Sequence, residues 1–333
     1  MRSLRRIRRS ACGSSDWGKD VTAARVHSAA REKRKGRIPS QGRQTGGMAE
    51  EKIWTIGRLL VWSEGFFREK GIETPRLDAE VLLAHVLEKP RIYLYVHYDQ
   101  PLDPEELAAY RGFVRRRAAR EPVAYLVGER EFMGLTFAVS PAVLVPQPDT
   151  ETLVSEAQKR LQGKSGVRIA DVGTGSGAIA LSLLHALPEL TAAAVDVSAA
   201  ALKVARENAD HFGLTDRVMF YEGDLLAPLR GQTFDAVLSN PPYIPRGDIA
   251  ALPPEVQAEP RLALDGGADG LDFYRRLVRE AAAFLRPDGF LAVEAGRGEA
   301  AVISELARTN GWTEVEITKD LAGIDRVVTM RRG

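Results

Sequence analysis

Four consecutive residues, Asn240 to Tyr243, combine chemical groups that suit a flat NH2 group. The run Asn-Pro-Pro-Tyr follows an apolar stretch, so it stands at the tip of an expected strand. Its two prolines fix φ and carry no N–H, which stiffens the turn and leaves backbone carbonyls free to accept hydrogen bonds. The Asn240 side-chain oxygen and the Pro241 carbonyl can hold both hydrogens of an NH2 group while the Tyr243 ring packs against it. A plain proline-stiffened turn is the competing interpretation. The candidate substrate-binding residues are Asn240, Pro241, Pro242 and Tyr243, and those with a catalytic role are Asn240, Pro241 and Tyr243.

A second group of chemically suited residues begins at Asp171, in the run Asp-Val-Gly-Thr-Gly-Ser-Gly. Its glycines allow the backbone to approach a ligand closely, and with Ala178 the run also satisfies a dinucleotide-binding pattern. Asp171 precedes the first glycine by two residues, where it would repel a pyrophosphate and attract a sulfonium or an amino group. Because no later stretch supplies an evident hydride-transfer site, we favour S-adenosylmethionine over NAD as the cofactor. The candidate binding residues here are Asp171, Gly173, Thr174, Gly175, Ser176 and Gly177.

Further cofactor-binding positions follow two other expected strands. Asp196 comes 23 positions after Gly173 and can accept both hydroxyls of a ribose, cap the helix expected from Ala199, or do both. Asp224 can accept a hydrogen bond from an adenine amino group while Leu225 packs on the ring; an ordinary turn is the competing interpretation. Because parallel strands share one carboxyl edge, these residues should meet there. The expected cofactor site thus also includes Asp196, Asp224, Leu225 and Asn240.

A parallel sheet is needed to position these residues, and the pattern from about residue 152 predicts one. Strand-like and helix-like segments alternate, which indicates right-handed βαβ units in a doubly wound sheet. We expect helices between the first five strands, and an antiparallel hairpin from the last two because their connection, residues 319–325, is short. The strands are expected at Arg168–Val172, Ala192–Val197, Val218–Glu222, Phe234–Leu238, Gly289–Ala295, Thr313–Thr318 and Arg326–Met330. This α/β arrangement resembles the Rossmann-like, seven-stranded class I methyltransferase fold.

Upstream of the sheet, residues 48–120 predict a small helical domain. Helical periodicity is present in Ile53–Lys70 and Arg76–Glu88. A third helix should begin after an Asp103 N-cap, followed by Pro and two Glu, and run to about Arg120. The arginines of this third helix form either a solvated face or a surface that docks RNA or an acidic protein.

A connector, residues 121–150, joins the helical domain to the methyltransferase domain expected over residues 151–333. Its alternating apolar residues predict a β-hairpin with Gly134 near the bend. After the hairpin, Thr150 or Asp149 can cap the helix that follows.

Composition limits the location and the chemistry. The chain has 333 residues, of which 44% are hydrophobic and 27% are charged, which is ordinary for a globular protein. No apolar run approaches the length of a membrane span. The single cysteine, Cys12, rules out a disulfide framework, and the five histidines show no metal-ligand spacing. We therefore expect no metal site, no membrane partner and a cytoplasmic location.

Charge divides the chain at Met48. Residues 1–47 carry a net charge of +10, whereas the remainder carries −9. This leader is rich in Arg, Ser and Gly and poor in aliphatic residues, which predicts disorder. It can be a basic nucleic-acid-binding arm, an organelle transit peptide, or an upstream extension of a chain that starts at Met48. The clean start Met-Ala-Glu-Glu favours the extension.

Longer runs resemble one enzyme family, the peptide chain release factor glutamine methyltransferases of the HemK type. The resemblance extends from about Lys52 to Val328, with one visible departure at Gln147, where the family usually has Arg. The runs that carry it are residues 145–151, 171–180, 239–245, 259–267, 270–277 and 322–326.

The resemblance implies methylation of a glutamine side-chain nitrogen, N5, in the Gly-Gly-Gln motif of class 1 release factors, with S-adenosylmethionine as donor. It assigns Gly173–Gly177, Asp196 and Leu225 to the cofactor and Asn240–Tyr243 to the glutamine. It also implies that the helical domain binds the release factor. We expect a monomer with no direct nucleic-acid substrate.

Three alternatives stay open. Ribosomal-protein glutamine methyltransferases share the core motif. An adenine-N6 nucleic-acid methyltransferase also binds an NH2 group, that of adenine. Such enzymes flip the base out of the duplex and usually need a basic recognition region. The chain after Met48 is acidic and lacks an added domain of that size. The third alternative is a non-catalytic protein that binds release factors or ribosomes.

Overall fold

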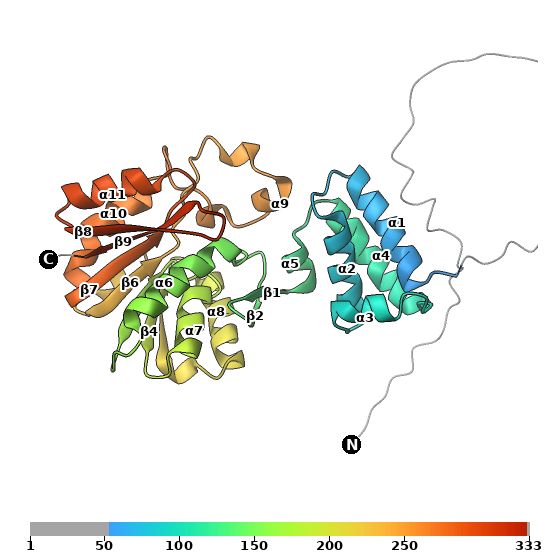
Figure 1. Cartoon of the computed structure of the whole chain (residues 1–333), viewed down its shortest axis with the longest axis horizontal. Helices are drawn as coiled ribbons and strands as arrows, with labels where there is room; N and C mark the ends of the chain where they lie inside the picture. Colours follow the sequence, from blue (N-terminus) through green and yellow to red (C-terminus); the bar gives the residue numbers. More distant parts are fainter. Residues whose placement is uncertain (1–52, 332–333) are drawn as a thin grey trace, which may run out of the picture.

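The computed structural model describes residues 53–331. The basic leader, residues 1–47, and the expected start at Met48 lie outside this range. Figure 1 shows a bundle of helices beside a larger part in which helices cover both faces of a sheet. Within residues 53–331, no helix is long and apolar enough to cross a membrane.

Four helices form the first part. The first begins after Thr55, whose hydroxyl accepts a hydrogen bond from the Arg58 N–H. The fourth begins with a complete capping box between Asp103 and Glu106, as the run Asp-Pro-Glu-Glu predicts. The short third helix was not among the expected ones. The helices are α1 (Ile56–Glu69), α2 (Pro75–Val86), α3 (Arg91–Val96) and α4 (Pro104–Ala118).

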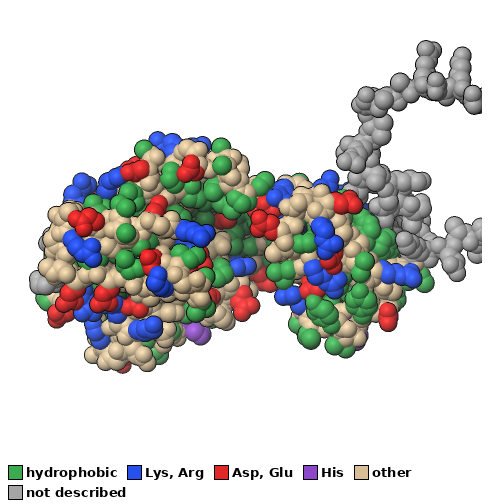
Figure 2. Space-filling view, turned by 45° about the horizontal axis from the view of Figure 1, so that its top comes forward, with side chains coloured by type: hydrophobic (Ala, Val, Ile, Leu, Met, Phe, Trp, Pro, Cys, Tyr) green, Lys and Arg blue, Asp and Glu red, His purple; other side chains and the backbone are tan. Residues whose placement is uncertain are grey.

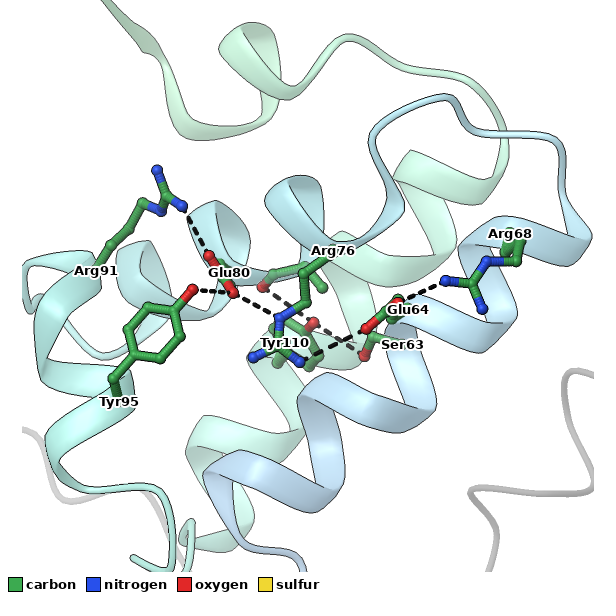
Figure 3. A network of polar contacts seen from close by, with 9 residues as sticks. Ser63, Glu64, Arg68, Arg76, Glu80, Arg91, Tyr95 and Tyr110 are labelled. Atoms are coloured by element: carbon green, nitrogen blue, oxygen red, sulfur yellow. Dashed lines mark hydrogen bonds and ion pairs between the residues drawn. The ribbon is translucent and has the colours of Figure 1, made fainter.

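A buried carboxylate ties α2 to α3 (Figure 3). The Glu80 side chain is 2% exposed and accepts hydrogen bonds from Arg76 (2.6 Å) and Arg91 (2.7 Å). The Tyr95 hydroxyl donates a third, at 2.5 Å. Although burial raises the pKa of Glu80, hydrogen bonds from Tyr95, Arg91 and Arg76 hold it below its ordinary value. The buried charge is therefore satisfied and links two helices.

A short helix and a hairpin connect the two parts (Figure 1). The hairpin turns at Met133 and Gly134, which both have positive φ, as a tight two-residue turn requires. Thr150 stands at the N-cap of the next helix but makes no capping hydrogen bond with its side chain, contrary to expectation. These elements are α5 (Val123–Val127), β1 (Glu129–Phe132), β2 (Leu135–Ala138), the 3-10 turn η1 (Pro148–Thr150) and α6 (Glu151–Leu161).

The second part is a seven-stranded sheet in the order β5-β4-β3-β6-β7-β9-β8. Neighbours from β5 to β7 are parallel, and β9 pairs antiparallel with both β7 and β8. The expected seven strands and terminal hairpin are confirmed. The strands are β3 (Arg168–Val172), β4 (Thr191–Asp196), β5 (Val218–Glu222), β6 (Phe234–Ser239), β7 (Leu285–Glu294), β8 (Glu314–Lys319) and β9 (Asp325–Arg331).

The helices of this part differ from expectation at one connection. Between β5 and β6 there is only a 3-10 turn, Ala227–Leu229, so the helix expected there is wrong. The connection is short, and Pro228 and Gly231, which has φ of 82°, interrupt it. The helices are α7 (Ala178–Ala186), α8 (Ala199–His211), α9 (Pro254–Gln257), α10 (Asp272–Glu280) and α11 (Ala300–Thr309).

The segment between β6 and α10 reaches back to the helical part. In α9, the Glu255 carboxylate pairs with Arg117 at 2.8 Å and with Arg120 at 3.3 Å. Arg117 is buried and also pairs with Asp78 of α2, at 2.7 Å. One guanidinium therefore joins the helical part to the segment that follows the Asn-Pro-Pro-Tyr tip.

Candidate active site

A cleft of about 930 Å³, open to solvent, lies at the carboxyl edge of the parallel strands. Figure 2 shows a recess with hydrophobic side chains on the side of the sheet part that faces the helical part. Its position is where open α/β sheets bind ligands. The expected residues that line it are Gly173, Gly175, Asp196, Asp224, Leu225, Asn240, Pro241 and Pro242.

The glycine-rich loop presents bare backbone to this cleft. Gly173 and Gly175 have φ of 75° and 55°, and a Cβ built on either would meet nothing within 4 Å. Any side chain there would be strained and would enter the open space that a ligand needs. Gly177 has another role: it is the N-cap of α7 with φ of 84°, and a Cβ there would lie 2.8 Å from the Leu181 side chain of the same helix.

The Asp171 carboxylate lies beneath the loop and does not line the cleft. It is fully buried, and its Oδ2 accepts hydrogen bonds from the Thr174 hydroxyl (2.6 Å) and the Ala180 N–H (3.1 Å). Burial raises its pKa to about 6 despite these two bonds. Its Oδ1 has no partner among the described residues. Thr174 and Ser176 are buried as well, so these expected binding residues support the loop from behind.

The Asp196 carboxylate joins the loop to the cleft wall. Its Oδ2 accepts from the Gly175 N–H and its Oδ1 from the Ser198 N–H, both at 2.9 Å. The capping interpretation of Asp196 is wrong: Ser198 is the N-cap of α8, and its hydroxyl accepts from the Ala201 N–H at 3.2 Å. Asp196 therefore faces the cleft with both oxygens oriented by backbone donors.

The neighbouring Asp224 and Leu225 also line the cleft. Both oxygens of Asp224 accept hydrogen bonds from Arg276 of α10, at 2.9 and 2.7 Å. Leu225 has φ of 48°, a conformation uncommon for a residue with a side chain. Backbone strain of this kind concentrates at functional positions, which agrees with a ligand-facing role for Leu225.

Two hydrogen-bond acceptors are free at the tip of β6. The Asn240 Nδ2 donates to the Thr150 hydroxyl oxygen at 3.1 Å. Within residues 53–331, no group donates a hydrogen bond to the Asn240 Oδ1 or to the Pro241 carbonyl. Both residues line the cleft, so both acceptors belong to its wall.

Glycines crowd around the tip and explain the glycine-rich runs further along the chain. A Cβ on Gly266 would lie 2.8 Å from the Tyr243 Cα, and one on Gly270 would clash with the Tyr243 carbonyl oxygen. A Cβ on Gly296 would lie 2.9 Å from the Tyr243 ring. The tip is also paired with this segment, because the Gly266 N–H donates to the Ile244 carbonyl at 2.9 Å.

The Tyr243 ring lies against Gly296 and is not among the residues that line the cleft. It is half-buried, and burial raises its pKa to about 12, so its hydroxyl stays protonated at neutral pH. Its expected contact with a substrate stays a prediction.

The apolar walls of the cleft were not assigned from the sequence. They come from the connector, from the segment after the tip and from α10. The only sequence signal for them is that residues 259–267 and 270–277 belong to the family-like runs. The walls include Ala142, Leu144, Pro260, Leu262 and Phe273.

Gln147 stands at the position where the family usually has Arg. Its side-chain NH2 donates a hydrogen bond to the Val145 carbonyl at 3.0 Å, within its own segment.

The sheet order and the terminal antiparallel hairpin are those of the class I methyltransferase fold. Solved structures that share this fold include two complexes of one catalytic domain. The hMettl16 catalytic domain in complex with MAT2A 3'UTR hairpin 1 aligns with a TM-score of 0.52 and 17% identity, over 74% of this chain and 90% of that chain. The complex with hairpin 6 aligns with a TM-score of 0.50 and 18% identity, over 68% and 81%. At these identities the likeness shows the fold alone.

Sequence comparison identifies the family. A family model described as "PrmC N-terminal domain" matches residues 58–128, and "Methyltransferase small domain" matches residues 147–251. The release factor glutamine methyltransferase of Geobacter sulfurreducens is 48% identical over 283 residues, which are 85% of this chain and 98% of that protein. That of Moorella thermoacetica is 49% identical over 257 residues, or 77% and 91%.

The chain therefore belongs to the release factor glutamine methyltransferase family. It is an S-adenosylmethionine-dependent methyltransferase, as the sequence predicts. The cleft fits that donor, because the bare backbone at Gly173 and Gly175 leaves room for it and a carboxylate, Asp196, stands on the wall.

Proposed function

We propose that this enzyme methylates the side-chain amide nitrogen, N5, of the glutamine in the Gly-Gly-Gln motif of class 1 peptide chain release factors, and so modulates translation termination. The names of its relatives support this substrate. The observation that carries the proposal is the pair of free acceptors at the cleft, the Asn240 Oδ1 and the Pro241 carbonyl.

The cofactor site follows from the cleft residues. When bound, S-adenosylmethionine supplies a methyl group on a positively charged sulfur. We assign its contacts to the bare backbone of Gly173 and Gly175, and its ribose hydroxyls to Asp196, whose oxygens each keep a second lone pair. Leu225 then packs on the adenine and Asp224 accepts from its amino group. Asp171, Thr174, Ser176 and Gly177 hold the loop in the conformation that these contacts need.

The tip residues supply positioning and electrostatics. An amide nitrogen is a weak nucleophile because its lone pair is delocalised. Holding its two N–H groups at Asn240 and Pro241 raises electron density on nitrogen and aims the lone pair at the methyl group. The N–CH3 bond forms as the S–CH3 bond breaks, and the nitrogen then releases one proton to solvent. Pro242 and Tyr243 keep the tip rigid, and Tyr243 packs against the substrate.

The helical part, residues 48–120, is assigned to recognition of the release factor, and the connector, residues 121–150, joins it to the catalytic part, residues 151–333. The partner is a protein and not a nucleic acid, which the acidic balance of the chain after Met48 supports. We infer that the enzyme acts as a cytoplasmic monomer.

A tritium-transfer assay tests the proposal. Purified enzyme is incubated with methyl-labelled S-adenosylmethionine and a purified class 1 release factor, and label should enter the release factor. A release factor whose Gly-Gly-Gln glutamine is replaced by Ala is the control and should stay unlabelled. Label that enters only DNA or only ribosomal proteins would overturn the proposal, and label in no substrate would favour a non-catalytic binder.

A further inference from the structure

Behind the tip of β6, the Asn240 carboxamide donates a hydrogen bond to the buried Thr150, which interacts in turn with the buried Glu294. The reaction touches neither of these two residues. We propose that Thr150 and Glu294 are positioning residues that fix the orientation of this carboxamide. In this orientation its oxygen, and not its nitrogen, faces the substrate. The inference rests on the proposed function, because the substrate NH2 group is what requires an oxygen there.

The three residues meet because of the sheet order. Glu294 ends β7, which pairs with β6 in a register that places Val293 opposite Ser239, the residue before Asn240. Thr150 comes from the turn before α6, whose helix packs on the same sheet. The Thr150 residue is 5% exposed and Glu294 is 1% exposed, so water does not compete for their hydrogen bonds.

The direction of the hydrogen bonds follows from the protons available. The Thr150 hydroxyl lies close enough to the Glu294 carboxyl to lower the pKa of that group. While Glu294 is ionised it can only accept, so the single hydroxyl proton points to Glu294. Thr150 can then only accept from Asn240, and the Asn240 Nδ2 is indeed the donor, at 3.1 Å. The Asn240 Oδ1 is left pointing away from Thr150, free for the substrate.

The backbone leaves the Thr150 hydroxyl available for these contacts. A Thr that caps a helix has extended backbone and accepts a hydrogen bond from an N–H of the first turn. Thr150 ends the 3-10 turn η1 with helical φ of -66° and ψ of -20°, and its side chain makes no capping bond. Its oxygen accepts from the Asn240 Nδ2 instead.

The surroundings of Glu294 make the arrangement sensitive to pH. Burial raises the pKa of Glu294 to about 7, the Thr150 hydrogen bond and Arg326 of β9 lower it, and Asp149 raises it. Tyr243 and Tyr274 of α10 also lie within its field. Its Oε2 has no partner among the described residues. Once protonated, Glu294 can donate to Thr150, whose proton is then free to bond the Asn240 Oδ1, so the preferred orientation is lost as pH falls through about 7.

Two substitutions at one position separate the hydroxyl from the shape of the side chain. Thr150→Val keeps the shape and removes the hydroxyl, and Thr150→Ser keeps the hydroxyl. We expect Thr150→Val to lower kcat by about tenfold to a hundredfold with unchanged affinity for S-adenosylhomocysteine by calorimetry, and Thr150→Ser to recover turnover. Thr309→Val is the matched control, because that exposed hydroxyl bonds only carbonyls of its own helix. Wild-type kcat in Thr150→Val, or an equal loss in Thr150→Ser, would overturn the proposal.

A pH profile and NMR supply readouts that a merely structural role would not move. The kcat of the wild type should rise as pH increases through about 7, and Glu294→Gln should abolish this rise. A pH-dependent rise that persists in Glu294→Gln would contradict the role of Glu294.

Exchange of the Asn240 side-chain NH2 protons with solvent is measured by NMR, and the signals are assigned with Asn240→Ala. This exchange should be slow in the wild type and faster in Thr150→Val. Unchanged exchange refutes the positioning itself. Slow exchange in a wild type that labels no release factor refutes only the proposed function.

Discussion

At the scale of single residues, the Asn240 carboxamide divides its two ends between the protein and the ligand. Its nitrogen donates to Thr150 and its oxygen is free at the cleft. Asn240→Ala removes both, but it leaves the glycine-rich loop and the Asp196 wall untouched. We expect kcat to fall by about a hundredfold or more, measured by tritium transfer, while calorimetry shows unchanged affinity for S-adenosylhomocysteine. Normal turnover in this variant would refute the role assigned to Asn240.

The glycines around the tip allow a second test at this scale. Gly266→Ala would place a methyl group 2.8 Å from the Tyr243 backbone, in contact with atoms that cannot move aside cheaply. We expect a folded enzyme in which the tip is displaced and kcat is reduced by about a hundredfold. Gly247→Ala lies in the same segment with nothing within 4 Å of the new Cβ, and it serves as the control. Equal turnover in the two variants would show that the crowding at the tip does not matter.

At the scale of elements, the segment after the tip is held to the connector by Glu259. This carboxylate is buried and accepts from the Val145 N–H at 2.8 Å. Burial raises its pKa to about 7, above the ordinary 4.5, although the hydrogen bond lowers it. The folded protein therefore holds a proton that the unfolded chain has released between these two pH values. The stability contributed by this group is present at low pH and is lost as pH rises towards 7.

Glu259→Gln keeps the acceptor oxygen and removes the charge. We expect the free energy of unfolding at pH 8 to increase by up to about 3 kcal/mol and its pH dependence between pH 5 and 8 to become weaker. Urea denaturation at the two pH values measures both quantities. Glu259→Ala is the comparison: it removes the same charge but leaves the Val145 N–H without its partner, so at pH 8 it should be less stable than Glu259→Gln by about 1–3 kcal/mol. An unchanged pH dependence in Glu259→Gln would contradict the raised pKa.

At the scale of the whole molecule, Arg117 joins the helical and sheet parts. Its pairing with Asp78 is almost fully buried, whereas Glu255 is partly exposed. Asp78→Asn leaves a buried guanidinium short of one charge, and we expect a loss of about 3 kcal/mol in the free energy of unfolding. Glu255→Gln should cost no more than about 1 kcal/mol. Urea denaturation compares the two variants, and a larger loss for Glu255→Gln would show that the contact between the parts carries the stability.

Sequence reasoning succeeded where the pattern is local. Alternating apolar runs placed all seven strands to within a few residues, and Asp103 marked the start of α4 correctly. It was wrong for the β5–β6 connection, where Pro228 and Gly231 leave room for one turn only, and it did not predict α3. Short segments such as α3 depend on tertiary contacts, here the Glu80 network, which periodicity does not report.

The sequence by itself determined the sheet, the glycine-rich loop and the free carbonyls of the proline-rich tip, because each follows from backbone properties of Gly, Pro and apolar residues at short spacing. Only the tertiary structure decided how side chains far apart in the chain share their hydrogen bonds. It placed Asp171 behind the loop and not on the cleft wall, gave the N-cap of α8 to Ser198, and turned Thr150 from a helix cap towards Asn240. A polar side chain bonds whichever partner the packed fold brings within 3 Å or so, and the spacing of residues along the chain does not encode that choice.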